Sequence, residues 1–278
     1  MRILLSNDDG IAAPGLAALR AAATGLGEVT VVAPDSPQSA AGHGITVQRS
    51  LTVRAASLGP TGAPGPPGEG LSVDGRPADC VRLAARNLMD PPPELVLSGI
   101  NAGANVGINV FYSGTVAAAA EGAMLGIPSV AFSAEAVDGG ADFARAGRVA
   151  RWVLRRLVAI GLRPGDLVNV NIPAARPRGL RVVRQSTAEI EDIYHREDDA
   201  GAPAEGGGKR RYYLGCDYRF IGHEDDDVTC LAEGFVTVTP LHADMTSHER
   251  LPALAGADWG EPPPKRGACG LAAGRREA

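Results

Sequence analysis

Residues 94–126 read ELVLSGINAGANVGINVFYSGTVAAAAEGAMLG, and they predict a strand, a loop and a helix in direct succession. The apolar run at residues 95–97 is typical of a strand that is buried on both faces. Glycine and asparagine then alternate from Gly99 to Asn109. Because both residues adopt positive φ at low cost, we expect a loop with an unusual backbone path rather than a regular element. Residues 116–125 are alanine-rich and predict a helix that Ser113 or Thr115 can cap.

The start of this helix is a candidate anion site. A helix N-terminus presents free N–H groups and the positive end of the helix dipole. A buried strand, a glycine-rich loop and a capped helix in this order indicate a site for an anion of the size of phosphate. The stretch is not a P-loop, because the Gly-Lys-Ser/Thr ending is absent.

The N-terminal residues predict a second unit of the same kind. Residues 3–5 form a buried strand, Pro14 suits the first turn of a helix to about residue 24, and residues 29–33 form another strand. This spacing is typical of a βαβ unit with parallel strands and a right-handed crossover. We therefore expect an α/β fold with a Rossmann-like, mostly parallel sheet and helices on both faces. Ligands of such sheets bind beyond the carboxyl ends of the strands, where Asp8, Asp9 and Asn101 would lie together.

The adjacent carboxylates of Asp8 and Asp9 indicate a metal site. Two neighbouring acids repel each other unless a cation neutralises them, and Mg²⁺ or Mn²⁺ prefers oxygen ligands. An Asp-Asp-Gly turn without a metal is the alternative. Asn101 adds an amide oxygen, and Ser39, which follows the second strand, adds a hydroxyl at the same edge. Taken alone, Ser39 would be an ordinary loop serine.

The rest of the chain predicts further elements and a change of character after residue 166, beyond which we expect no catalytic residue. Residues 50–71 are rich in glycine and proline and predict a flexible excursion. Residues 211–214 and 235–239 alternate as half-exposed strands, which predicts hairpins without a core of their own that contact another subunit. We therefore expect a core over 1–180, a hairpin extension over 181–260 and a disordered tail over 261–278. Other expected elements are a helix opening within 74–86, a strand at 128–133, a helix at 148–161, and strands at 168–172 and 181–183.

Composition and charge exclude several classes of protein. The net charge of −5 over 278 residues provides no basic surface for a nucleic-acid polymer or an anionic membrane. The four cysteines are scattered without a Cys-x-x-Cys motif, so neither a zinc site nor a disulfide framework is indicated. We expect no signal peptide, because Arg2 leads directly into a strand. We expect no membrane span either, because no apolar run approaches the required length. We expect a soluble cytoplasmic protein.

Five motifs give the chain a resemblance to the SurE survival proteins, a family of metal-dependent 5′/3′-nucleotidases. They are MRILLSNDDG at 1–10, VVAPDSPQS at 31–39, SGINAGANVG at 98–107, YSGTVAAAAEG at 112–122 and VTPLHADMT at 238–246. The resemblance implies that one divalent metal, Mg²⁺ or Mn²⁺, binds to Asp8, Asp9, Ser39 and Asn101. It also implies a phosphate site lined by Asn105, Ser113, Gly114 and Thr115. The family fold is a Rossmann-like core with a C-terminal extension that exchanges between the subunits of homodimers or homotetramers.

The implied activity is hydrolysis of nucleoside 5′- and 3′-monophosphates to nucleoside and phosphate. Asp9 is the candidate for orienting or deprotonating the attacking water, with Asp8 chiefly a ligand, and the reverse assignment stays open. Ser113, Thr115 and loop amides would stabilise charge on the phosphoryl oxygens. His43 is near Ser39 and could reach the substrate, although a structural role is the commoner one for such a histidine.

Two positions depart from the pattern that this family usually shows. The chain has Ala40 where glycine is usual and Arg76 where threonine is usual. Neither residue is an expected ligand, so the departures bear on loop shape and substrate preference rather than on the chemistry.

Other functions compete with this interpretation. A broad-specificity phosphatase or exopolyphosphatase would use the same site. A phosphoacceptor receiver domain needs an aspartate at the end of its third strand and a later lysine, but the corresponding strand here ends in Ser-Gly-Ile-Asn at 98–101. A metal-dependent deacetylase with His-Pro-Asp-Asp after its first strand would need His-Pro where this chain has Ser6 and Asn7. A non-catalytic nucleotide-binding protein is the third alternative.

Overall fold

The structure, a computed structural model, describes residues 1–58, 68–137, 140–187, 190–191, 194–196, 211–214, 219–220 and 223–260. The chain divides into two compact units, Met1–Ala243 and Asp244–Ala278. The first unit contains the main sheet. In the second unit, the described residues include one short helix, α7 (Leu251–Ala255). None of the helices in the described part of the chain is long and apolar enough to cross a membrane.

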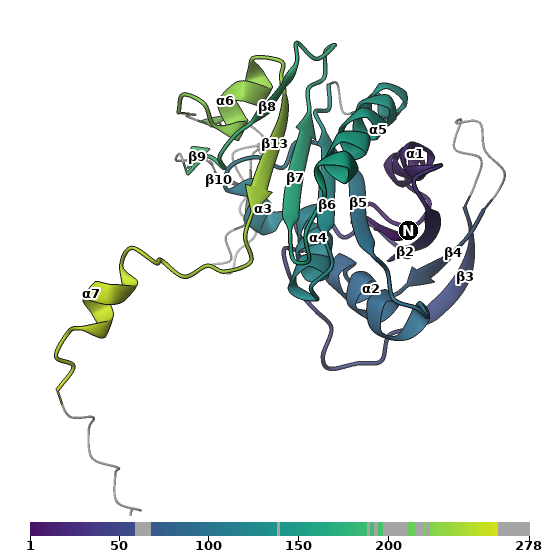
Figure 1. The fold of residues 1–278 in the computed structure, drawn as a ribbon, viewed down its shortest axis with the longest axis horizontal. Helices are drawn as coiled ribbons and strands as arrows, with labels where there is room; N and C mark the ends of the chain where they lie inside the picture. The colour runs from purple at the N-terminus through teal and green to yellow at the C-terminus, as the bar shows by residue number, and fades with distance from the viewer. Residues whose placement is uncertain are drawn as a thin grey trace, which may run out of the picture. The chain divides into compact units, whose positions relative to one another are not determined.

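The first unit is built on a nine-stranded sheet with the order β3-β4-β2-β1-β5-β6-β7-β13-β8 (Figure 1). Its parallel strands are β4 (Gly68–Val73), β2 (Glu28–Pro34), β1 (Arg2–Ser6), β5 (Leu95–Ala102), β6 (Ser129–Ala134) and β7 (Leu167–Ile172). At one end β3 (Val53–Leu58) runs antiparallel to β4. At the other, β13 (Val236–Leu241) runs antiparallel to β7 and pairs in parallel with β8 (Leu180–Val182).

Helices cover both faces of this sheet. On one side α1 (Pro14–Ala23) packs against α5 (Phe143–Ile160), and on the other α2 (Pro77–Leu83) packs against α4 (Gly114–Met124) (Figure 1). Strand β1 shows the alternation that this requires: Ile3 and Leu5 join the core under α1 and α5, whereas Leu4 joins the core under α2. The predicted Rossmann-like, mostly parallel α/β fold is therefore confirmed.

Several short elements complete the described chain. A π-helical turn (Ala84–Leu88) follows α2, α3 (Asn109–Tyr112) precedes α4, and α6 (Asp227–Ala232) precedes β13. Strand β9 (Ile190–Glu191) pairs with β12 (Arg219–Phe220), and β10 (Tyr194–Arg196) pairs with β11 (Tyr212–Leu214).

Two local expectations differ from the structure. The excursion expected at 50–71 is wrong near its two ends, which form β3 and the first part of β4 and join the sheet; the expectation for residues 59–67 lies outside the described residues. The loop expected to begin at Ser98 is also shorter, because β5 continues to Ala102. Gly99 makes this possible. Its φ is 117°, and a Cβ at this position would lie only 2.2 Å from the carbonyl oxygen of Phe132 on β6, so a residue with a side chain would not fit.

The extension expected after residue 180 is partly integrated into the sheet. Strand β13 is buried rather than half-exposed, with Val236 and Val238 in the main core. Its alternate residues Thr237 and Thr239 are buried too, so this strand is covered on both faces. The division after residue 180 stays a prediction, but strands β8 and β13 belong to the nine-stranded sheet. The tail predicted at 261–278 lies outside the described residues.

Candidate functional site

The acid pair lies directly after β1, against the start of α4. Asp8 is buried, and its carboxylate accepts hydrogen bonds from the Thr115 hydroxyl and from the N–H groups of Thr115 and Gly114. A Cβ on Gly114 would lie 2.7 Å from the Cβ of Asp8, which explains why a glycine stands there. Ser113 caps the helix as expected, because its hydroxyl accepts the N–H of Val116 at 3.1 Å. The start of α4 thus binds a carboxylate of this chain.

Both carboxyl groups have raised pKa values. Burial raises the pKa of Asp8, although the hydrogen bonds from Thr115 and Gly114 oppose this. Burial also raises the pKa of Asp9, and the neighbouring charge of Asp8 raises it further; the N–H of Ala102 opposes both effects. The contact with Ala102 places Asp9 beside the end of β5, so the two polar loops predicted at one edge of the sheet meet there.

Asn101 and Ser39 lie on the segments that adjoin the acid pair. The side-chain amide nitrogen of Asn101 donates to the carbonyl oxygen of Gly103 at 2.9 Å. The side-chain oxygen of Asn101 is thereby left for another partner. The N–H of Gln38 donates to the carbonyl oxygen of Asp8 at 2.7 Å, and Ser39 follows as an exposed residue. The four expected ligands therefore lie on three segments: Asp8 and Asp9 follow β1, Ser39 follows β2, and Asn101 is near the end of β5. The segment of Ser39 hydrogen-bonds to Asp8, and the end of β5 hydrogen-bonds to Asp9.

The chemistry of this donor set fits a hard divalent cation. Among the described residues no three His, Cys, Asp or Glu side chains form a metal-binding group, so the set depends on neutral oxygens beside the two acids. Carboxylate, amide and hydroxyl oxygens are the ligands that Mg²⁺ and Mn²⁺ prefer. A cation there would counter the burial and mutual repulsion that raise the pKa values of Asp8 and Asp9.

Asn105 is held by a buried network of neutral polar groups. Its backbone N–H donates to Asn171 Oδ1 at 2.8 Å, and its carbonyl oxygen accepts the side-chain amides of Asn169 at 2.8 Å and Asn171 at 3.2 Å. The side chain of Asn105 donates to Ser133 Oγ at 2.8 Å. All four residues are buried. Sequence reasoning missed the three partners; an Asn-x-Asn pattern inside a strand expected to be buried was the available signal.

The same loop is tied to residues much further along the chain. The N–H of Gly107 donates to Asp227 Oδ2 at 3.0 Å, 120 positions away, and its carbonyl oxygen accepts from Gln185 at 2.8 Å. The other oxygen of Asp227 accepts the N–H of Ser186 at 2.8 Å, and burial raises the pKa of this carboxyl group. Residues of the C-terminal part of the chain, where we expected no catalytic residue, therefore hold this loop by hydrogen bonds.

His43 is engaged with a buried acid. Its Nε2 lies 2.9 Å from Oε2 of Glu121, whose other oxygen accepts from Arg82 Nε at 2.7 Å. The side chain of Glu121 is 1% exposed. Burial alone would raise the pKa of Glu121, but the hydrogen bonds from His43 and Arg82 outweigh it and lower the pKa. Sequence reasoning missed Glu121, although an acid in the middle of an alanine-rich helix was a signal.

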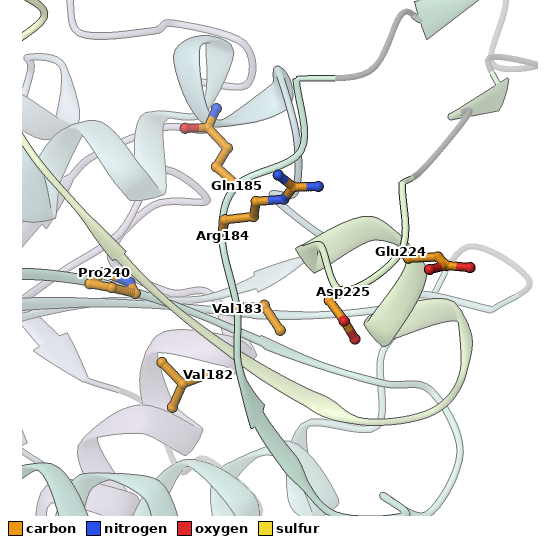
Figure 2. A pocket seen from close by; sticks show the side chains of 7 residues that line it. All are labelled: Val182, Val183, Arg184, Gln185, Glu224, Asp225 and Pro240. Atoms are coloured by element: carbon orange, nitrogen blue, oxygen red, sulfur yellow. The ribbon is translucent and has the colours of Figure 1, made fainter. Parts of the chain in front are cut away.

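A separate hollow of about 630 Å³ lies beside strand β8 (Figure 2). It is lined by Val182, Val183, Arg184, Gln185, Glu224, Asp225 and Pro240. None of the expected metal or phosphate ligands lines it. Its connection to the site is indirect, through the hydrogen bond of Gln185 to the Gly107 carbonyl oxygen. We therefore assign the candidate site to the acid pair.

Comparison with known proteins gives a consistent result. The family described as "Survival protein SurE" matches residues 3–192. A Thermus thermophilus protein named 5′-nucleotidase SurE 1 is 46% identical over 92% of this chain and 97% of its own length. A Chloroflexus aggregans protein named 5′-nucleotidase SurE is 43% identical over 93% of this chain and 100% of its own length. The crystal structure of the SurE protein from Aquifex aeolicus matches with a TM-score of 0.73 and 35% identity, covering 91% of this chain and 98% of that one. This chain belongs to the SurE survival protein family.

Proposed function

We propose that this protein is a metal-dependent 5′-nucleotidase that hydrolyses nucleoside monophosphates to nucleoside and phosphate. The observation that carries the proposal is the pair Asp8–Asp9, two partly or fully buried acids with raised pKa values at the carboxyl edge of a parallel sheet. Relatives named 5′-nucleotidase cover more than nine-tenths of the chain at up to 46% identity, which supports the substrate class.

Asp8, Asp9, Ser39 and Asn101 would hold one divalent cation, Mg²⁺ or Mn²⁺. When bound, such a cation polarises a phosphoryl oxygen and lowers the pKa of a water molecule. Asp8 is suited to a ligand role, because Thr115 and the start of α4 fix its carboxylate. Asp9 is less buried and has fewer fixed partners, so we assign to its carboxylate oxygen the task of orienting the attacking water and accepting its proton.

The expected phosphate residues divide into one that contacts the phosphate and three that support the site. Ser113 Oγ accepts a bond from Val116 N–H, so its own proton remains available for a phosphoryl oxygen. Thr115 and Gly114 donate to Asp8, and the side-chain amide of Asn105 donates to Ser133. We therefore propose that Ser113 contacts the phosphate directly, whereas Thr115 and Gly114 hold Asp8 and Asn105 fixes the loop.

A phosphate-release assay tests this function. Purified protein would be incubated with nucleoside 5′- and 3′-monophosphates in Mn²⁺, with and without a chelator, and polyphosphate would be included as a competing substrate. We expect release from nucleoside monophosphates that stops in chelator and is absent in Asp8→Asn. Undiminished release in excess chelator would contradict the metal dependence, and preferential release from polyphosphate would favour an exopolyphosphatase.

A further inference from the structure

The segment that carries Ser39 is fixed at both ends. On one side the N–H of Gln38 donates to the carbonyl oxygen of Asp8 at 2.7 Å. On the other side the N–H of Gly42 donates to the carbonyl oxygen of Tyr112 at 3.0 Å, just before α4. Ser39 and Ala40 lie between these two contacts and are exposed. The position of Ser39 relative to Asp8 therefore depends on how firmly the Gly42 end is held to the helices.

His43 supplies a side-chain contact at that end. Its ring nitrogen reaches Glu121 of α4, 78 positions away, and Glu121 is bound on its other side by Arg82 of α2. Glu121 is almost completely buried, so loss of one hydrogen-bond donor leaves part of its carboxylate without a partner. Helix α4 is also the helix whose first turn binds Asp8. One helix thus holds Asp8 at its start and the Ser39 segment through Glu121.

We propose that His43 is a positioning residue for the metal site. Through Glu121 it ties the segment carrying Ser39 to the helix that holds Asp8, and so keeps the Ser39 hydroxyl within reach of the ion that the two aspartates bind. The inference rests on the proposed function, because it takes Ser39 as a metal ligand. In this role His43 acts through Glu121, to which its Nε2 is committed, and not as a ligand of the metal or the substrate.

Metal titration separates this role from a general contribution to stability. Metal-free protein would be titrated with Mn²⁺ by calorimetry, with thermal unfolding measured on the same samples. In His43→Gln the amide nitrogen stands near the Nε2 position and can still donate to Glu121, whereas the shorter side chain of His43→Asn cannot reach it. His223→Asn is the matched control, because the His223 side chain is exposed and its described hydrogen bond to Asp226 uses the backbone N–H.

We expect His43→Asn to weaken Mn²⁺ binding by about 10–100-fold, the range typical of residues that orient metal ligands. His43→Gln should bind within about threefold of the wild type, and His223→Asn should be unchanged. A folded His43→Asn protein with wild-type Mn²⁺ affinity would overturn the proposal. So would equal losses in His43→Asn and His43→Gln, because the hydrogen bond would then not be the cause.

Two further outcomes keep the test decisive. If His43→Asn does not fold, Glu121→Met removes the same contact from the helix side with an apolar chain of similar length, and unchanged Mn²⁺ affinity in that variant overturns the inference. If the wild-type protein itself does not bind Mn²⁺, the proposed metal site fails before His43 is tested. The failure of the proposed function and the failure of this inference are therefore distinguishable.

Discussion

At the scale of single residues, Asp9 places function and stability in opposition. Burial and the charge of Asp8 raise the pKa of Asp9 above its usual value. At neutral pH the ionised Asp9 therefore destabilises the metal-free folded state. We expect Asp9→Asn to abolish phosphate release and yet to stabilise the metal-free protein by on the order of 1 kcal/mol, or about 2–4 °C in Tm.

The pH dependence of that gain follows from the sign of the shift. Because the folded state binds this proton more readily than the unfolded state, the cost is greatest above the folded pKa and shrinks as pH falls through it. The stability gained in Asp9→Asn should therefore be larger at pH 7 than at pH 4. Calorimetric unfolding at both pH values checks this, with exposed Asp35→Asn as the control. A variant less stable than the wild type at pH 7 would contradict the prediction.

Arg76 leaves helix α2 incompletely capped. The N–H of Arg76 donates to Asp79 Oδ2 at 2.9 Å, which is one half of a capping box, but a guanidinium cannot accept the N–H of Asp79 in return. Arg76→Thr supplies that acceptor and should stabilise the protein by about 0.5–1 kcal/mol. Chemical denaturation checks this against Arg76→Ala, which shortens the side chain without adding an acceptor. Equal stability of the two variants would argue against capping.

At the scale of elements, β7 holds the loop that follows β5. Asn171 accepts the N–H of Asn105 and donates to its carbonyl oxygen, so Asn171→Ala leaves a buried backbone donor without its partner. We expect a loss of about 1–3 kcal/mol in the free energy of unfolding. We also expect kcat/KM for nucleoside monophosphates to fall at least tenfold as the loop shifts. Kinetics and denaturation on one preparation check both effects. Exposed Asn87→Ala is the control, and an unaltered kcat/KM would show that this loop does not depend on β7.

At the scale of the whole molecule, exposed apolar side chains point to self-association. The antiparallel pair of strands β10 and β11 exposes Tyr194, Tyr212 and Tyr213 by more than half. In the second compact unit Met245 and Trp259 are 80% and 74% exposed. Such surfaces need a partner, and a second copy of this chain is the one that we propose. Light scattering should give at least a dimer; a 28.5 kDa monomer at micromolar concentration would contradict this.

Truncation locates the contact. Removal of residues from Ser186 onward would delete β13, whose Val236 and Val238 lie in the main core, so we expect insoluble protein rather than a stable monomer. A chain that ends at Ala243 keeps the first compact unit whole. We expect that shorter chain to stay folded by circular dichroism and to form an assembly with fewer chains than the full-length protein does, as given by its molar mass in solution divided by the mass of one chain. An unchanged assembly would assign the contact to the first unit.

The sequence by itself determined the fold class and the edge of the sheet at which Asp8, Asp9 and Asn101 lie. These follow from local rules: apolar runs of strand length, the βαβ spacing, and the position of polar residues just after a strand. A cap at Ser113 or Thr115 was predictable for the same reason, and the structure selects Ser113, whose hydroxyl accepts the N–H of Val116 only three residues away.

Only the tertiary structure decided how the site is supported. Asn105 meets Asn169 and Asn171 across more than 60 positions, His43 meets Glu121 across 78, and Gly107 meets Asp227 across 120. No local periodicity encodes these pairs. They form because packing of the sheet buries the polar groups, and a buried polar group is costly until it finds a hydrogen-bond partner, wherever in the chain that partner lies.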